Sequence, residues 1–199
     1  RKISMKKQLA ILISGNGGLM RRAIIEQQNV EAQYEVRLVV ASSSTCQGLN
    51  IATQYGIKTI VLDFSNRDVW EEKSLSLWKL LEDNGIDFVM LLGWIKKLTV
   101  SPQWRGRVFN VHPSLLPAYG GKGMIGYSVH QAVIKDKAQV SGFTCHEVNN
   151  NYDEGKILYQ YQCPVYSEDD ADTLQQRVIS LQHDKLFEVI QNLTNYIKK

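Results

Sequence analysis

QLAILISGNGGLMRRAIIEQQ, the stretch from Gln8 to Gln28, decides the fold. It opens with a continuous apolar run as far as Ser14, passes through the turn GNGG, and continues with apolar residues at helical spacing. This order predicts a strand, a glycine turn and a helix. Glycines let the backbone approach an anion, and a helix N-terminus offers free N–H groups. The turn is therefore either a phosphate cradle or a tight turn without a ligand.

The same alternation of apolar runs and helical patterns continues along the chain to Val111. Strands that alternate with helices predict βαβ units, a parallel sheet and right-handed crossovers. The run Ile86–Trp94 is the most apolar, which predicts a central strand covered on both faces. We therefore expect an α/β fold with a Rossmann-like open sheet and helices on both faces. Further strands are expected at 35–43, 57–63 and 107–111, and helices at 49–56 and 66–85.

The chain changes character after residue 111. Two strand-like runs, 138–150 and 156–166, are joined by the short polar segment NYDEG, and this spacing favours an antiparallel hairpin. A long amphipathic helical pattern follows from Glu168 to Ile197, with acidic residues at its start and two lysines after it, as the helix dipole favours. No repeat or linker interrupts the chain, so we expect a single domain over residues 1–199. Met5 is a candidate native start, in which case residues 1–4 are an addition.

The composition is that of an ordinary globular protein of 199 residues, 44% hydrophobic and 22% charged. The 23 basic and 20 acidic side chains give a net charge of +3, which offers little support for a nucleic-acid partner. No window approaches the roughly 18 consecutive apolar residues of a membrane span. The three cysteines lie far apart without C-x-x-C spacing, which predicts neither a zinc site nor a disulfide framework. We expect a cytoplasmic protein with reduced thiols, no metal and small-molecule substrates.

A second stretch, FNVHPSLLPAYGGKG from Phe109 to Gly123, carries the candidate chemistry. Asn110 and His112 are two residues apart on a strand, so both side chains point to one face at its carboxyl end. An amide beside an imidazole is typical of a site that stabilises an oxyanion and transfers a proton. The alternative is that His112 is a structural residue whose hydrogen bonds are all made within the protein. The prolines and glycines behind the pair predict a rigid mount followed by a mobile loop. Asp153 or Glu154, in the NYDEG turn, could lie beside His112, and a carboxylate there would raise the pKa of the imidazole. The alternative is that the turn exposes these side chains to solvent.

The segment NVHPSLLPAYGG resembles the N-x-H-P-S-L-L-P signature of the folate-dependent formyltransferases. The likeness runs from ILISGNGG through LLGWIKKLTVSP to DEGKILYQ and RVISLQH, which is nearly the whole chain. It implies transfer of a formyl group from 10-formyltetrahydrofolate to the amine of glycinamide ribonucleotide in de novo purine biosynthesis. Asn110, His112 and Asp153 are the catalytic residues that it implies. It also implies a cis peptide bond between Leu116 and Pro117, and we expect a monomer or a homodimer.

The resemblance assigns binding residues as well. It implies a nucleotide-binding-like half over residues 5–110 and a folate and catalytic half over residues 111–199. The folate-binding residues that it implies are Arg67, Ile95, Lys96, Lys97, Leu98, Asn110, Asn149, Asn150, Asn151, Tyr152 and Asp153. The acceptor-binding residues that it implies are Gly17, Gly18, Leu19, Met20, Pro117 and Gln182.

Three positions depart from the pattern of this family. GNGGLM stands where the family usually has G-N-G-S-N, so the polar side chains that flank the substrate phosphate are replaced. Gln182 stands in place of a glutamate that contacts a ribose, and Lys96 replaces a common arginine. The donor half therefore matches better than the acceptor half. The alternatives are formyl transfer to another amine, such as one on an amino sugar nucleotide, and a silent folate- or nucleotide-binding module.

Overall fold

The computed structural model describes residues 5–197. The expectation that residues 1–4 precede a native start lies outside this range, and so do the two lysines at the end of the chain. The stretch that decides the fold forms strand β1 (Lys7–Ile13) and helix α1 (Gly18–Glu26), separated by the glycine turn. The predicted strand, turn and helix are confirmed.

The alternation predicted from the sequence is present along the rest of the chain. The second half of the sheet comes from two strands that form a hairpin, and a long helix closes the chain. The elements after α1 are β2 (Tyr34–Ala41), α2 (Gly48–Gln54), β3 (Lys58–Val61), the short 3-10 helix η1 (Arg67–Val69), α3 (Trp70–Asp83), β4 (Phe88–Leu91), the 3-10 helix η2 (Pro102–Trp104), β5 (Val108–His112), α4 (Tyr127–Lys135), β6 (Val140–Glu147), β7 (Ile157–Pro164) and α5 (Ala171–Tyr196).

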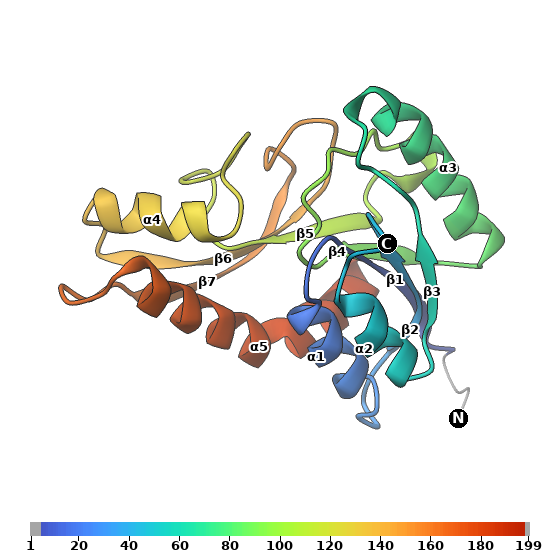
Figure 1. The fold of residues 1–199 in the computed structure, drawn as a ribbon. Coiled ribbons are helices and arrows are strands. Elements are labelled where there is room, and N and C mark those ends of the chain that lie inside the picture. The colour runs from blue at the N-terminus through green and yellow to red at the C-terminus, as the bar shows by residue number, and fades with distance from the viewer. Residues whose placement is uncertain (1–4, 198–199) are drawn as a thin grey trace.

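Within residues 5–197, seven strands form one sheet in the order β3-β2-β1-β4-β5-β6-β7 (Figure 1). The pairs from β3 to β5 are parallel, whereas β6 runs antiparallel to both β5 and β7. The Rossmann-like sheet and the antiparallel hairpin are therefore confirmed. Strand β4 is the middle strand and is buried along its whole length, as its apolar run predicted.

Side chains of β1 alternate between two hydrophobic layers, one on each face of the sheet. Leu9, Ile11 and Ile13 belong to the layer that also contains buried residues of α1, α2 and α5. Ala10 and Leu12 belong to the opposite layer, which α3 covers. Figure 1 shows α3 on one side of the sheet and α1, α2 and α5 on the other. Because both faces are covered, the central strands read as continuous apolar runs in the sequence.

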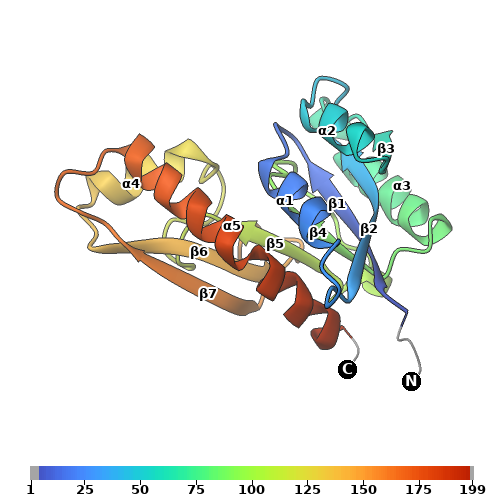
Figure 2. The ribbon, with the colours of Figure 1, turned by 90° about the horizontal axis from the view of Figure 1, so that it is seen from below.

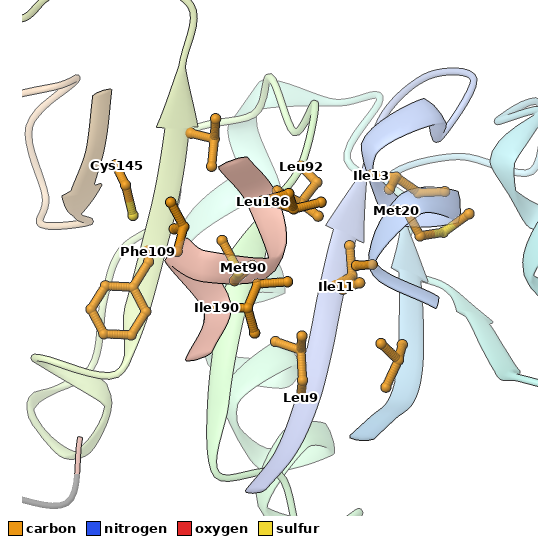
Figure 3. Close-up of a cluster of buried hydrophobic side chains, with 14 of the residues drawn as sticks. Leu9, Ile11, Ile13, Met20, Met90, Leu92, Phe109, Cys145, Leu186 and Ile190 are labelled. Atoms are coloured by element: carbon orange, nitrogen blue, oxygen red, sulfur yellow. The ribbon is translucent and has the colours of Figure 1, made fainter. Parts of the chain in front are cut away.

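Helix α5 lies along the sheet and joins its two halves. Figure 2 shows it crossing from the hairpin strands toward α1. Figure 3 shows Leu186 and Ile190 of this helix against Met90 of β4, near Phe109 of β5. The helix begins at Asp170, whose carboxylate accepts a hydrogen bond from the Thr173 N–H at 2.8 Å. The parallel strands and the hairpin therefore share one core.

Helix α4 is the element that the sequence reading missed. It follows the glycine-rich stretch, which was interpreted as a mobile loop, and its buried residues Val129, His130 and Val133 have helical spacing. Gly126 precedes the helix with a φ of 52°, so a glycine marks its start. Between residues 5 and 197, no helix is long and apolar enough to cross a bilayer.

Candidate active site

Asn110 and His112 lie where the sheet changes direction. Strand β5 pairs in parallel with β4 on one side and antiparallel with β6 on the other, and Asn110 lies opposite His146 of β6. Phe109 and Val111 face the hydrophobic layer under α5, so the alternate residues Asn110 and His112 face the other side of the sheet. The predicted common face of the amide and the imidazole is confirmed, since both line one cavity.

The segment behind His112 is held by a network of hydrogen bonds. The Thr144 hydroxyl of β6 donates to the Ser114 carbonyl at 2.7 Å and accepts from the Leu116 N–H at 3.0 Å. The Gln160 amide of β7 donates to the Leu116 carbonyl at 2.9 Å. The peptide bond between Leu116 and Pro117 is cis, as expected. Residues 113–118 therefore form the rigid mount predicted from the prolines.

Asp153 lies between two buried histidines. Its Oδ2 is 3.6 Å from His112 Nδ1, and its Oδ1 is 3.5 Å from His146 Nε2. The Gly121 N–H donates to the same carboxylate at 2.9 Å, which ties the glycine-rich loop to this group. Glu154 is exposed, so of the two candidate carboxylates only Asp153 reaches His112.

The turn that carries Asp153 has a strained and crowded backbone. Asp153 has a φ of 56°, in the left-handed region that favours glycine. Two residues later, a Cβ on Gly155 would lie 1.7 Å from the carbonyl oxygen of Glu147. The Asn150 amide oxygen accepts a hydrogen bond from the Val100 N–H at 2.8 Å, which fixes the turn against the segment after β4. The turn is thus built to hold its carboxylate in one place.

His146 is a site residue that the sequence reading missed. Its Nε2 is 3.2 Å from the Asn110 amide nitrogen, and its side chain is only 3% exposed. The sequence carries only a weak signal, because His146 is one of several polar residues of β6, which also contains Ser141 and Thr144. The pairing partner of that strand could not be read from the sequence, so nothing connected His146 to Asn110.

Burial dominates the electrostatics of His112. Burial lowers the pKa of this imidazole below its usual value, although the Asp153 carboxylate and the Tyr119 carbonyl act in the opposite direction. The Asp153 carboxylate acts in the expected direction, but loss of water around a ring that is 5% exposed outweighs it, so the net pKa is lowered. Burial alone would raise the pKa of Asp153, but hydrogen bonds and the two histidines together lower it. At neutral pH the site holds a neutral His112 beside an ionised carboxylate.

A cavity of about 550 Å³ opens beside these groups. Lys96 Nζ and Arg67 Cζ lie 5.8 and 5.5 Å from the ring centre of Trp70, so this part of the cavity wall is cationic and aromatic. Within residues 5–197, no group of three or more His, Cys, Asp or Glu side chains is arranged to hold a metal ion. The cavity lining includes every residue predicted to bind folate: Arg67, Ile95, Lys96, Lys97, Leu98, Asn110, Asn149, Asn150, Asn151, Tyr152 and Asp153.

Only part of the glycine turn and the start of α1 faces the cavity. Leu19 lines the cavity, whereas Met20 is fully buried in the core. Gly17 has a φ of 74°, and a Cβ there would lie 3.0 Å from the Cα of Gly48, so the turn packs tightly against α2. The prediction that the Met20 side chain contacts an acceptor is not supported by this placement. Pro117 likewise lies outside the cavity lining, and so do Gly17 and Gly18.

Neutral polar groups also line the cavity. Gln182 of α5 is 5% exposed and faces the cavity, together with Ile179 one turn earlier and Gln175 two turns earlier. His130 of α4 also faces it, is 1% exposed, and its Nδ1 has no hydrogen-bond partner among the described residues. Burial lowers the pKa of His130 to about 4, and the nearby His112 acts in the same direction. This part of the cavity wall therefore offers uncharged hydrogen-bonding groups.

Comparison with known proteins shows what this arrangement is similar to. Residues 7–190 match the family model described as formyl transferase. The chain is 36% identical over 188 residues to a chloroplastic phosphoribosylglycinamide formyltransferase of Arabidopsis thaliana, covering 93% of this chain and 64% of that protein. It is 35% identical over 190 residues to the protein of the same name from Vigna unguiculata, with 94% and 61% covered. The chain thus spans slightly less than two thirds of the length of these curated relatives.

A solved structure agrees with the whole described fold. The crystal structure of phosphoribosylglycinamide formyltransferase from Brucella melitensis matches with a TM-score of 0.83 and 29% identity. The match covers 94% of this chain and 95% of that one, so both the parallel half and the hairpin half have counterparts.

The buried His130 makes the stability of the fold depend on pH. In the unfolded chain this imidazole has a pKa of 6.5, so it binds a proton below that pH. In the folded chain its pKa is about 4, so it binds a proton only near pH 4. The free energy of unfolding should therefore fall as pH drops through this window, by as much as about 3 kcal/mol from this residue. The variant His130→Gln should lose less stability over the same window in urea unfolding. Equal losses in both proteins would contradict this prediction, and His183→Gln, at a less buried ring, is the matched control.

Proposed function

Because the chain belongs to the formyl transferase family, we propose that it transfers a formyl group from 10-formyltetrahydrofolate to the amine of glycinamide ribonucleotide, in de novo purine biosynthesis. The observation that carries this proposal is the convergence of Asn110, His112 and Asp153 on one cavity, whose wall contains both segments expected to bind folate. The names of the relatives, phosphoribosylglycinamide formyltransferase, support the same reaction.

The cavity suits a folate donor by its size and its charge. Pockets for ligands of drug-like size are usually about 300–1,000 Å³, and the volume of about 550 Å³ lies in this range. Residues 95–98 and 149–153 line the cavity and are proposed to surround the pteridine ring. Arg67, Lys96 and Lys97 supply positive charge for the carboxylates of the glutamate tail. Trp70 gives an aromatic surface in the same part of the cavity wall.

Asn110 is proposed as the donor to the developing oxyanion. When an amine attacks the formyl carbon, negative charge grows on the formyl oxygen, and a fixed N–H donor stabilises that charge. The Asn110 amide is held at its strand position by pairing with both β4 and β6, so little reorganisation is needed during the reaction. One such donor typically contributes about 10²- to 10³-fold to the rate.

His112 is proposed to carry the proton. Its Nε2 lies 2.8 Å from the Tyr119 carbonyl oxygen, which can only accept, so the neutral ring keeps its proton there and Nδ1 is a free base. Nδ1 takes the proton from the attacking amine and later gives it to the folate nitrogen that leaves. Asp153, 3.6 Å from Nδ1, stabilises the imidazolium in between. Since burial keeps His112 neutral at rest, the reaction starts with a base in place.

The acceptor is proposed to bind at the glycine turn and along α5. The first N–H groups of α1 lack partners within the helix and point along its axis, so they can hold a phosphate although Gly18 and Leu19 offer no polar side chain. Arg22 is paired with Glu26 at 2.7 Å, which leaves Arg21 as the freer charge. The Gln182 amide can donate to or accept from a sugar hydroxyl.

A second amine acceptor is the main competing proposal. It is favoured by two departures from the family pattern. This chain lacks the polar side chains of the usual glycine turn, and it has Gln182 where the family has a glutamate. An amino sugar nucleotide also offers an amine, a phosphate and hydroxyls. A silent binding module is less well supported, because the amide, the imidazole and the carboxylate all line one cavity, and His112 Nδ1 lies 3.6 Å from Asp153 Oδ2.

Cellular context and assembly belong to the same proposal. We propose a cytoplasmic enzyme with a small-molecule donor and acceptor, acting as a monomer or a homodimer. The thiols of Cys46, Cys145 and Cys163 are free and buried, as suits a reducing compartment. Residues 5–110 are proposed to bind the nucleotide at the glycine turn and to supply Asn110 and part of the folate wall, and residues 111–199 to supply the rest of that wall with His112 and Asp153.

The proposal is tested by following tetrahydrofolate release from 10-formyltetrahydrofolate. Purified protein should release it rapidly only when glycinamide ribonucleotide is added, and the ribonucleotide should gain one formyl group by mass. Release stimulated by an amino sugar nucleotide instead would support the competing acceptor. Release with no amine acceptor, or none with any, would contradict formyl transfer.

The role of Asn110 is tested by Asn110→Ala. The variant should keep the KM for the donor within about threefold and lose about 10²- to 10³-fold in kcat, because only the transition state carries the oxyanion. Asn195→Ala, at an exposed position on α5, is the matched control and should keep the original kcat. A kcat for Asn110→Ala within about twofold of the unmodified enzyme would remove the amide from the mechanism.

A further inference from the structure

The ring of His146 has a defined proton arrangement. Its Nδ1 lies 2.8 Å from the carbonyl oxygen of Glu147, and a carbonyl oxygen can only accept a hydrogen bond. Nδ1 therefore carries the proton of the neutral ring. The other nitrogen, Nε2, is then a lone-pair acceptor that points toward β5.

The acceptor at Nε2 selects one orientation of the Asn110 amide. The Asn110 nitrogen lies 3.2 Å from Nε2 and donates one of its two N–H bonds there. If the amide were turned over, its oxygen would face the lone pair of Nε2 and the hydrogen bond would be lost. In the observed orientation the second N–H of Asn110 remains available to the cavity, which both side chains line.

We propose that His146 is a positioning residue that fixes the Asn110 amide with its nitrogen toward the reacting formyl oxygen. This inference rests on the proposed function, since it gives Asn110 the role of oxyanion donor. Without the acceptor at Nε2, the two orientations of the amide become comparable in energy, and part of the enzyme presents an oxygen to the oxyanion. His146 itself need not touch the substrate.

Two variants of similar size separate positioning from a purely structural role. His146→Gln can place an amide oxygen near the position of Nε2, so it should keep kcat within about threefold. His146→Asn can replace Nδ1 but is too short to reach Asn110, and it should lose roughly tenfold in kcat, the size of one hydrogen bond, with the KM for the donor unchanged. His183→Gln is the matched control for kcat and KM.

A spectroscopic measurement keeps this inference separate from the proposed function. Nitrogen NMR of the ring in the unmodified protein should show His146 with its proton on Nδ1 and none on Nε2, whether or not formyl transfer is detected. A ring with its proton on Nε2 would overturn the inference, and so would equal kcat values for the Gln and Asn variants. If no acceptor is formylated while the predicted tautomer is found, the proposed function fails and the positioning of the amide stands.

Discussion

One carboxylate holds the candidate site together. Asp153 comes from a turn between β6 and β7, yet it lies between His112 of β5 and His146 of β6 and accepts an N–H from Gly121 of the glycine-rich loop. A buried carboxylate is costly unless hydrogen bonds and opposite partial charges surround it. The groups that lower that cost are the same groups that the chemistry needs. The contacts of this one carboxylate therefore set its own position and charge and the conformation of the glycine-rich loop.

The reversal of strand direction at β5 makes this interaction possible. On its parallel side β5 continues the sheet built on β1 and β4, which fixes Asn110 against a fully buried core. On its antiparallel side it meets β6, so that Asn110 lies opposite His146 and the returning turn delivers Asp153 to the same end of the sheet. The cavity then forms at the carboxyl ends of β1, β4 and β5, where open α/β sheets usually bind ligands.

The parts of the site that the sequence predicted are those encoded by local spacing. Asn110 and His112 share a face because they are two residues apart, and the glycine turn follows β1 because a long apolar run ends there. Local patterns do not encode which strands pair or in what register. For this reason the sequence could not decide between Asp153 and Glu154, and it did not place His146 in the site. The carboxylate raises the pKa of His112 as expected, but the larger, opposite effect of burial was not predicted, because the depth of burial depends on the whole packed structure. Helix α4 was missed because glycines before it suggested that the mobile loop continued.

The central claim is that the Asp153 carboxylate enables His112 to become charged during the reaction. The most direct test is kcat of Asp153→Asn, which keeps the shape and the Gly121 hydrogen bond but removes the charge. The account predicts a loss of about 10²-fold or more in kcat, with the midpoint of urea unfolding and the affinity for a folate analogue nearly unchanged. A kcat within about threefold of the unmodified enzyme would contradict it, because His112 would then carry the proton without its carboxylate.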